Sequence, residues 1–249
     1  MCAADRIRII LQDAEGEPRL SGALVALMVE TLCGAAAPGV VTLEGSPGVF
    51  CQGMSLEGMA PLLEVSPNTA LTEALDRYGD IVAAIRACPR PVMALVDGPA
   101  LGGGCGIAAA ADVVLATRRA TFALPEALIG LIPVFAFTSV ADRTGISRAR
   151  LMAMGGPVLD ADQALRAGLV DEIADDLEAA ALRYASRFAR MDQRAIAAIK
   201  RIVANTWPSA EGYVPAARLA AIALGATSET RARLSRLVAG ELPWIVSAE

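Results

Sequence analysis

Carboxylates are the natural candidates for acid/base chemistry in this chain, because the sequence has no histidine and a single lysine, Lys200. Without histidine there is no Ser-His-Asp triad, no Cys-His pair and no histidine-ligated metal, and we predict no metal site. Acid/base chemistry near neutral pH then falls to a carboxylate, a perturbed lysine or a tyrosine.

A run of glycines offers a second kind of chemistry. Residues 98–106 are Gly-Pro-Ala-Leu-Gly-Gly-Gly-Cys-Gly and lead into a predicted helix. Glycines before a helix present backbone N–H groups at its positive end, where they bind a phosphate or stabilise an oxyanion. The phosphate alternative lacks the GxxxxGK(S/T) pattern, and one match to a dinucleotide fingerprint is weak. Close packing of a helix on a strand is the structural alternative and stays open at this point.

Another glycine lies in residues 50–54, Phe-Cys-Gln-Gly-Met, which follow a predicted strand. A glycine after a strand is common, and a plain turn is the default interpretation for this segment alone. The segment gains interest only in combination with the glycine run and with a third element that carries a carboxylate.

The spacing of apolar residues predicts an α/β fold with crossover connections. Short apolar runs bounded by turn residues indicate strands, and helical periodicity indicates the elements between them. Residues 54–69 lack clear periodicity, and we predict a mobile loop that gives substrate access. The predicted strands are residues 7–11, 40–43, 92–96 and 113–116, and the predicted helices before residue 147 are 20–33, 71–87 and 105–111.

The last hundred residues are predicted to be mostly helical. Apolar periodicity indicates long helices at residues 196–206 and 215–238. No linker separates them from the preceding part, so we predict one domain with a core at residues 1–190 and a helical C-terminal extension at residues 191–249.

Composition excludes several classes of protein. The chain has 249 residues, of which 55% are hydrophobic and 20% charged, which is typical of a globular protein. A net charge of −5 and the absence of a basic stripe argue against a nucleic-acid partner. No apolar stretch is long enough for a membrane span, and charges near the N-terminus argue against a secretion signal, so we predict a cytoplasmic protein. Five cysteines without a CxxC pair are expected to be reduced thiols.

Three segments together resemble the crotonase (enoyl-CoA hydratase/isomerase) superfamily, in its order and spacing. They are residues 48–54, 96–106 and 121–133, and residues 168–172 add a similar strand start. The resemblance implies that the backbone amides of Gln52 and Gly103 form an oxyanion hole and that Glu126 is the catalytic carboxylate. Taken alone, Glu126 after Pro125 is more typical of an acid at the start of a helix, where it stabilises the helix dipole by about 0.3–1 kcal/mol.

The same resemblance implies a fold and a substrate class. The fold is α/β, a spiral of ββα turns with a helical C-terminal trimerisation region, so a homotrimer or hexamer is expected. The substrate is a thioester on the phosphopantetheine arm of an acyl carrier protein or of CoA, with no other cofactor. Loss of an α-proton leaves negative charge on the thioester oxygen, which two fixed N–H donors stabilise.

One departure from the superfamily narrows the chemistry. Its hydratases usually carry a second glutamate two residues after the triple glycine, and here that position is Gly106. In the family the missing carboxylate orients water, whereas the retained one, here Glu126, handles the α-proton. This argues against an ordinary fatty-acid hydratase and leaves syn elimination of water or a double-bond shift.

Within the superfamily, the chain looks similar to the dehydratases of polyketide β-branching (HMG-CoA-synthase) cassettes. Residues 124–133, the tail at 237–244 and the Phe-Cys-x-Gly-Met segment carry this likeness. Those lyases convert 3-hydroxy-3-methylglutaryl-acyl carrier protein to 3-methylglutaconyl. The companion decarboxylases rely on lysine and histidine, which counts against decarboxylation here. Ser55 departs from the subgroup, which has Asp at this position.

Two alternatives remain open from sequence. An enoyl-thioester isomerase also needs only Glu126, and an acyl-thioester binding protein without catalysis is suggested by Gly106 and Ser55 together. Tyr78 and Arg86 lie on one predicted helix, and Arg86 could meet a substrate carboxylate, but a solvated face is the more common interpretation for both. The predicted substrate pocket comprises Met54, Ser55, Tyr78, Arg86, Gly106 and Pro133.

Overall fold

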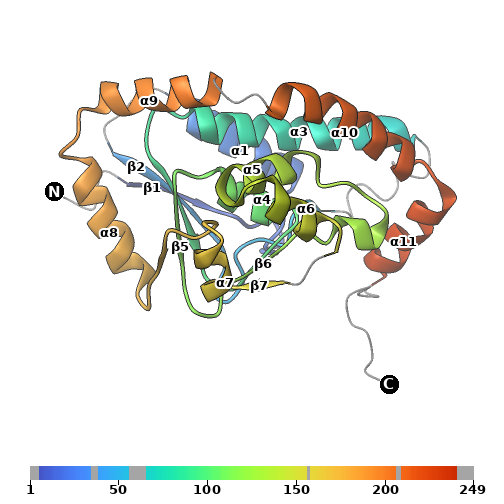
Figure 1. The fold of residues 1–249 in the computed structure, drawn as a ribbon, viewed down its shortest axis with the longest axis horizontal. Coiled ribbons are helices and arrows are strands. Elements are labelled where there is room, and N and C mark those ends of the chain that lie inside the picture. Colours follow the sequence, from blue (N-terminus) through green and yellow to red (C-terminus); the bar gives the residue numbers. More distant parts are fainter. Residues whose placement is uncertain (1–5, 35–38, 56–65, 156–157, 206–208, 240–249) are drawn as a thin grey trace.

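A computed structural model describes residues 6–34, 39–55, 66–155, 158–205 and 209–239. Its main sheet contains five parallel strands in the order β1-β2-β3-β5-β8 (Figure 1). The central strands are covered on both faces and are therefore apolar throughout, as the fully buried β3 and β5 illustrate, whereas the edge strand β1 carries Arg6 and Arg8. The strands are β1 (Arg6–Ile10), β2 (Val40–Glu44), β3 (Val92–Val96), β5 (Val113–Ala116) and β8 (Glu172–Ile173).

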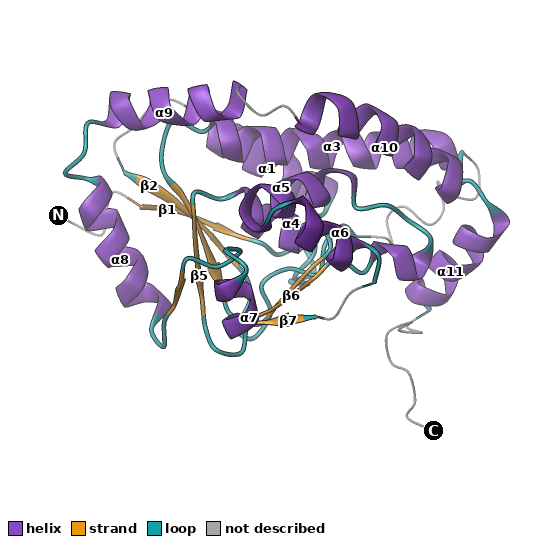
Figure 2. Ribbon diagram, viewed as in Figure 1, coloured by secondary structure: helices purple, strands orange, loops and turns teal. Residues whose placement is uncertain are grey.

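Alternate side chains of β3 enter two separate layers of core. Met93 and Leu95 pack against Ala180 and Ala181 of helix α8 (Leu177–Phe188) on one face of the sheet. Val92, Ala94 and Val96 face the larger core on the other side, beneath the remaining helices. Figure 2 shows this arrangement, with α8 apart from the other helices. Those on the larger-core side include α1 (Gly22–Cys33), α3 (Pro67–Ala87), α4 (Gly103–Ala110), α5 (Val134–Thr144) and α6 (Ile146–Ala153).

A second, smaller sheet follows the main one along the chain. It has the order β4-β6-β7, from β4 (Pro99–Leu101), β6 (Thr121–Ala123) and β7 (Leu159–Asp160). Each main-sheet strand in this region is followed by a small-sheet strand and then a helix: β3, β4 and α4, then β5, β6 and the 3-10 helix η2 (Glu126–Ile129). Helix α7 (Ala161–Arg166) follows β7. The architecture confirms the predicted α/β fold of ββα turns.

The C-terminal part is helical, but the predicted helix at 215–238 is wrong. Two helices replace it, α10 (Ser209–Gly225) and α11 (Ser228–Val238), and they follow α9 (Gln193–Asn205). The break has a local cause, because the Thr227 side chain accepts a hydrogen bond from Thr230 N and caps α11. Figure 1 shows α10 lying along α3, and it also packs on α5, while α11 packs on η2. Trimerisation through this region stays a prediction.

Two further sequence predictions concern the segment before α3. This helix begins at Pro67 rather than at residue 71, because proline suits the first helical turn, where no N–H partner is needed. Most of the predicted access loop, residues 56–65, lies outside the described residues, as do residues 240–244 of the tail. Among the described helices, none has the length and apolar character to cross a membrane.

Candidate active site

A cavity of about 490 Å³ lies where the 50–54 segment, the start of α4, η2 and α3 meet. The structure therefore brings together segments that are up to 80 residues apart in sequence, as the ends of parallel strands require. Six of the predicted residues line it, namely Gln52, Met54, Tyr78, Gly103, Glu126 and Pro133.

Glu126 enters the cavity from the short 3-10 helix that follows β6. Pro125 precedes this helix and Gly130 ends it in the left-handed conformation, with φ +78°, so the turn is fixed at both ends. Although the residue is partly exposed, its Oε2 atom is buried and no described group hydrogen-bonds to it. Burial raises the pKa of Glu126 to about 7. A carboxyl group with this pKa can both accept and return a proton near neutral pH.

The glycine run places the start of α4 directly beside this carboxylate. Gly102 has φ +54°, and a β-carbon there would lie 3.0 Å from Glu126 Oε1, so the close approach requires glycine. Gly103 is the first residue of α4, where a backbone N–H has no partner within the helix. Its amide is therefore available to a ligand in the cavity.

The amide of Gln52 is not available, which corrects the sequence prediction. Gln52 N donates to Pro18 O at 2.8 Å, because this segment pairs with the chain around Leu20. Leu20 N donates to Gly53 O at 2.9 Å and Ser55 N to Leu20 O at 3.1 Å. Met54 lies between these bonds, and within the described ranges no group accepts from its N–H. The structure thus presents the Met54 amide in place of the Gln52 amide.

Met54 and Gly103 belong to segments in direct contact. A β-carbon on Gly53 would lie 3.3 Å from Gly103 N, and Gly53 itself has φ +90°. The two amides are therefore at neighbouring positions on the cavity wall and can act on one oxygen atom. Met54 was predicted only as a pocket residue. The sequence did not indicate Met54 as a donor, because its free amide results from pairing with the segment around Leu20, about 34 residues earlier, and local sequence does not reveal that pairing.

Tyr78 reaches the cavity from α3 and packs on the first turn of α4. It is 5% exposed, and its hydroxyl donates to Gly103 O at 2.6 Å. Burial raises the pKa of the Tyr78 hydroxyl well above its ordinary value, and the nearby Glu126 carboxylate adds to the effect. Tyr78 therefore remains a protonated hydrogen-bond donor.

Gly106 does not line the cavity, although it was predicted as a pocket position. A β-carbon there would overlap the Tyr78 hydroxyl and would lie 2.5 Å from Ala136 Cα in α5. The tyrosine and α5 thus fill the space that a side chain at residue 106 would need. The position where the resemblance expected a second carboxylate has no room for one.

Ser55 and Arg86 also lie outside the cavity lining. The guanidinium of Arg86 contacts Asp142 at 2.8 Å and Ser139 Oγ at 3.3 Å, so it joins α3 to α5. The predicted contact of Arg86 with a substrate carboxylate is therefore wrong, since the side chain is committed to a neighbouring helix. Pro133 lines the cavity just before α5 begins.

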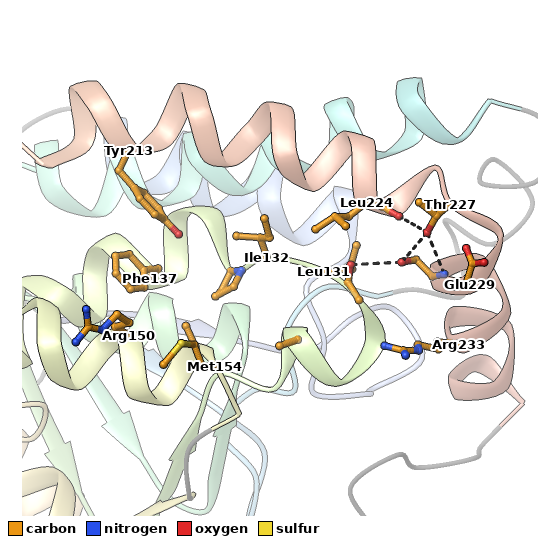
Figure 3. A pocket seen from close by; sticks show the side chains of 15 residues that line it. Leu131, Ile132, Phe137, Arg150, Met154, Tyr213, Leu224, Thr227, Glu229 and Arg233 are labelled. Atoms are coloured by element: carbon orange, nitrogen blue, oxygen red, sulfur yellow. Dashed lines mark hydrogen bonds between the residues drawn. The ribbon is translucent and has the colours of Figure 1, made fainter.

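A second cavity, of about 630 Å³, shares residues 131–133 with the first (Figure 3). In Figure 3, Tyr213 of α10 points toward Phe137 of α5, and the two rings stack with centroids 4.6 Å apart. Thr230 donates to Gly130 O at 3.4 Å, which ties α11 to the end of η2. Of the predicted site residues, only Pro133 lines this cavity.

Comparison with known sequences identifies relatives. The family described as enoyl-CoA hydratase/isomerase matches residues 8–220. A "Probable enoyl-CoA hydratase" of Rhodobacter capsulatus is 37% identical over 165 residues, which cover 65% of this chain and 62% of the relative. The 2,3-dehydroadipyl-CoA hydratase of Escherichia coli is 34% identical over 188 residues, covering 73% of this chain and 71% of that protein.

Solved structures share the fold. A candidate polyketide biosynthesis enoyl-CoA hydratase (pksH) from Bacillus subtilis superimposes with a TM-score of 0.84. The match covers 97% of this chain and 96% of that one, at 21% sequence identity. At this identity the likeness establishes a common fold and leaves the chemistry to the residues of the site.

Proposed function

Because the chain belongs to the enoyl-CoA hydratase/isomerase family, we propose that it dehydrates a β-hydroxyacyl thioester with Glu126 as the acid/base. One observation carries the proposal, a single carboxylate with a pKa of about 7 beside two backbone amides. Among the described residues that line the cavity, Glu126 is the only Asp or Glu.

The proposed reaction needs only these groups. The Glu126 carboxylate takes the α-proton, the C–H electron pair moves toward the thioester carbonyl, and the amides of Met54 and Gly103 stabilise the enolate oxygen. The enolate then collapses, the double bond forms between the α- and β-carbons, and the β C–O bond breaks. Glu126 returns its proton to the departing oxygen, which leaves as water, so protons and electrons balance.

Gly106 leaves Glu126 as the single carboxylate for both proton transfers. The family's second carboxylate orients the attacking water in hydration and, in the reverse direction, protonates the leaving hydroxyl. Here Tyr78 and Ala136 occupy the corresponding space. Glu126 therefore both takes the α-proton and returns it to the departing oxygen, which makes the proposed reaction a syn elimination.

We propose 3-hydroxy-3-methylglutaryl-acyl carrier protein as the substrate and 3-methylglutaconyl as the product, in polyketide biosynthesis. The Phe-Cys-x-Gly-Met segment supports this choice, and the pksH likeness is consistent with it through the fold. Arg19 also lines the cavity and places positive charge where an acyl group ending in a carboxylate would fit. A CoA thioester is the alternative carrier, and we propose a cytoplasmic homotrimer or hexamer.

A second candidate function uses the same residues. An enoyl-thioester isomerase would take a proton at one carbon and return it at another, which a single carboxylate can do. A single carboxylate at residue 126 is sufficient for either reaction. The mass of the product distinguishes dehydration from isomerisation, because only dehydration loses water. An acyl-thioester binding protein without catalysis would give neither product.

The deciding experiment is intact mass spectrometry of the acyl carrier protein. We expect incubation with 3-hydroxy-3-methylglutaryl-acyl carrier protein to remove one water, and Glu126→Gln to abolish this loss while binding persists. An unchanged mass with wild-type protein would overturn the substrate assignment. In that case a carrier-bound enoyl chain, followed by NMR for double-bond position, tests the isomerase.

A further inference from the structure

We propose that Tyr78 is a positioning residue that holds the oxyanion-binding turn of α4 in place through its hydrogen bond to Gly103 O. The proposal rests on the proposed function, since it assigns a role within the same site. It goes beyond the sequence resemblance, in which the glycine run alone forms this part of the oxyanion site.

The glycine run needs an external restraint. Gly102, Gly103 and Gly104 lack side chains, so their backbone has more conformational freedom than any other residue type allows. An oxyanion donor is effective only when its N–H is fixed in direction before the reaction. The glycines therefore allow the backbone to approach a substrate closely, whereas contacts with neighbouring residues must fix the direction of the Gly103 N–H.

Tyr78 supplies that restraint at one turn of the helix. Its hydroxyl donates to Gly103 O at 2.6 Å, and a β-carbon at Gly103 would lie 2.9 Å from its Cε2 atom. Its hydroxyl also abuts Gly106, three residues further on and on the same helix face. The ring thus packs between two glycines, and its hydrogen bond fixes the residue whose N–H faces the cavity.

Position 106 and Tyr78 are linked by packing. Any side chain at 106 would displace the tyrosine hydroxyl from Gly103 O. The residue that stands in the family's second-carboxylate position thus creates the space for the tyrosine. In this interpretation the site has exchanged a water-orienting carboxylate for a group that stiffens the oxyanion turn.

The test compares two reactions of Tyr78→Phe, which keeps the ring and removes the hydroxyl. Exchange of the substrate α-proton with D₂O and loss of water both pass through the enolate that Gly103 N stabilises. We expect both rates to fall together by about 10- to 100-fold, with KM little changed, because misplaced catalytic groups act mainly on kcat. Loss of dehydration with normal α-proton exchange would overturn the proposal, because Tyr78 would then act on the leaving oxygen.

Tyr184→Phe is the matched control. Tyr184 lies on α8, on the other face of the main sheet, where it packs on Phe188, and we expect its hydroxyl to be dispensable for turnover. Replacing Tyr78 by 4-aminophenylalanine restores a donor and should recover part of the lost rate. Equal rates for Tyr78→Phe and wild-type protein would overturn the proposal.

Amide hydrogen exchange provides a readout that does not depend on substrate. In Tyr78→Phe we expect faster exchange in peptides spanning residues 102–107, and no change there in Tyr184→Phe. Unchanged protection would contradict the positioning role even if the wild-type protein were inactive on the substrate tested. Failure of the proposed function would appear instead as a wild-type protein with protected α4 and no turnover.

Discussion

Two carboxylates flank helix α4, and the structure surrounds them in opposite ways. Asp112 follows the end of the helix, accepts from Val92 N at 2.7 Å and contacts the ammonium group of Lys200. Glu126 lies beside the start of the same helix, where its Oε2 atom has no partner among the described groups. Neighbouring groups thus hold Asp112 in an ion pair, whereas the described groups leave the buried oxygen of Glu126 without a partner.

The two environments give Asp112 a structural role and Glu126 a chemical one, although both residues lie close to α4. Lys200 is buried and also donates to Ile85 O at 3.2 Å and Arg90 O at 3.0 Å, so it fixes α9, α3 and the start of β3 together. Asp112 therefore has a structural role, as the acceptor that ties this lysine to β3. Burial raises the pKa of Glu126 to about 7, so this carboxyl group can accept and return a proton near neutral pH.

Exchanging each acid for its amide should separate the two roles most clearly. Glu126→Gln removes the acid/base and should lower kcat by about 10³-fold, the usual scale for such groups. Asp112→Asn should leave kcat unchanged, because the residue does not line the cavity. Steady-state kinetics on the carrier-bound substrate measures both. Equal losses of kcat in the two variants would refute the comparison.

The amides near Glu126 provide the next largest effect. Replacing the Met54 N–H by an ester oxygen, through incorporation of the α-hydroxy acid, should lower kcat by about 10²-fold because one oxyanion donor is lost. The same change at residue 52 removes the bond to Pro18 O and should cost about 1 kcal/mol of stability with little effect on kcat. A large loss of kcat for the ester at residue 52, with little effect at residue 54, would instead identify the Gln52 amide as the oxyanion donor.

Lys200→Met tests the structural side of the comparison. It leaves Asp112 and two carbonyl groups without their partner, and we expect the free energy of unfolding to fall by about 2–3 kcal/mol. The expected loss of stability is at the low end for a broken buried ion pair, because the Asp112 side chain is 31% exposed. Urea denaturation measures the change. Adding Asp112→Asn to Lys200→Met should recover part of it, and a fully additive loss would argue against coupling between the pair.

The pH dependence of stability gives a further test, because the raised pKa of Glu126 fixes the sign of the effect. Since the pKa of Glu126 is raised from 4.5 to about 7, the folded protein binds more protons than the unfolded chain between these values. The stabilisation of the folded protein by this bound proton is fully present below pH 4.5 and is lost as the pH rises through 7. A shift of this size corresponds to about 3 kcal/mol. Because the residue is partly exposed, solvent screening lowers the effect, and we expect Glu126→Gln to be more stable than wild type by about 2 kcal/mol at pH 8 and equal to it at pH 4. A difference independent of pH would show that Glu126 is not desolvated.

Local pattern was enough for much of the fold. The predicted strands at 92–96 and 113–116 are β3 and β5, because apolar runs in a buried parallel sheet leave little ambiguity. The helix at 215–238 was predicted as continuous because apolar periodicity persists through residues 226–227. A threonine cap that depends on local geometry divides it.

Sequence by itself made a carboxylate the natural candidate for acid/base chemistry, singled out Glu126 through the family resemblance, and placed glycines at residues 102–104 before a helix. Tertiary structure decided which groups are free to act. Pairing with Pro18 and Leu20 occupies Gln52 N and leaves Met54 N, Asp142 takes Arg86 out of the site, and Tyr78 fills the space above Gly106. The physical reason is common to all of these cases: a hydrogen-bond partner or a packing neighbour more than 20 residues away sets the availability of a group, and no local pattern encodes that partner.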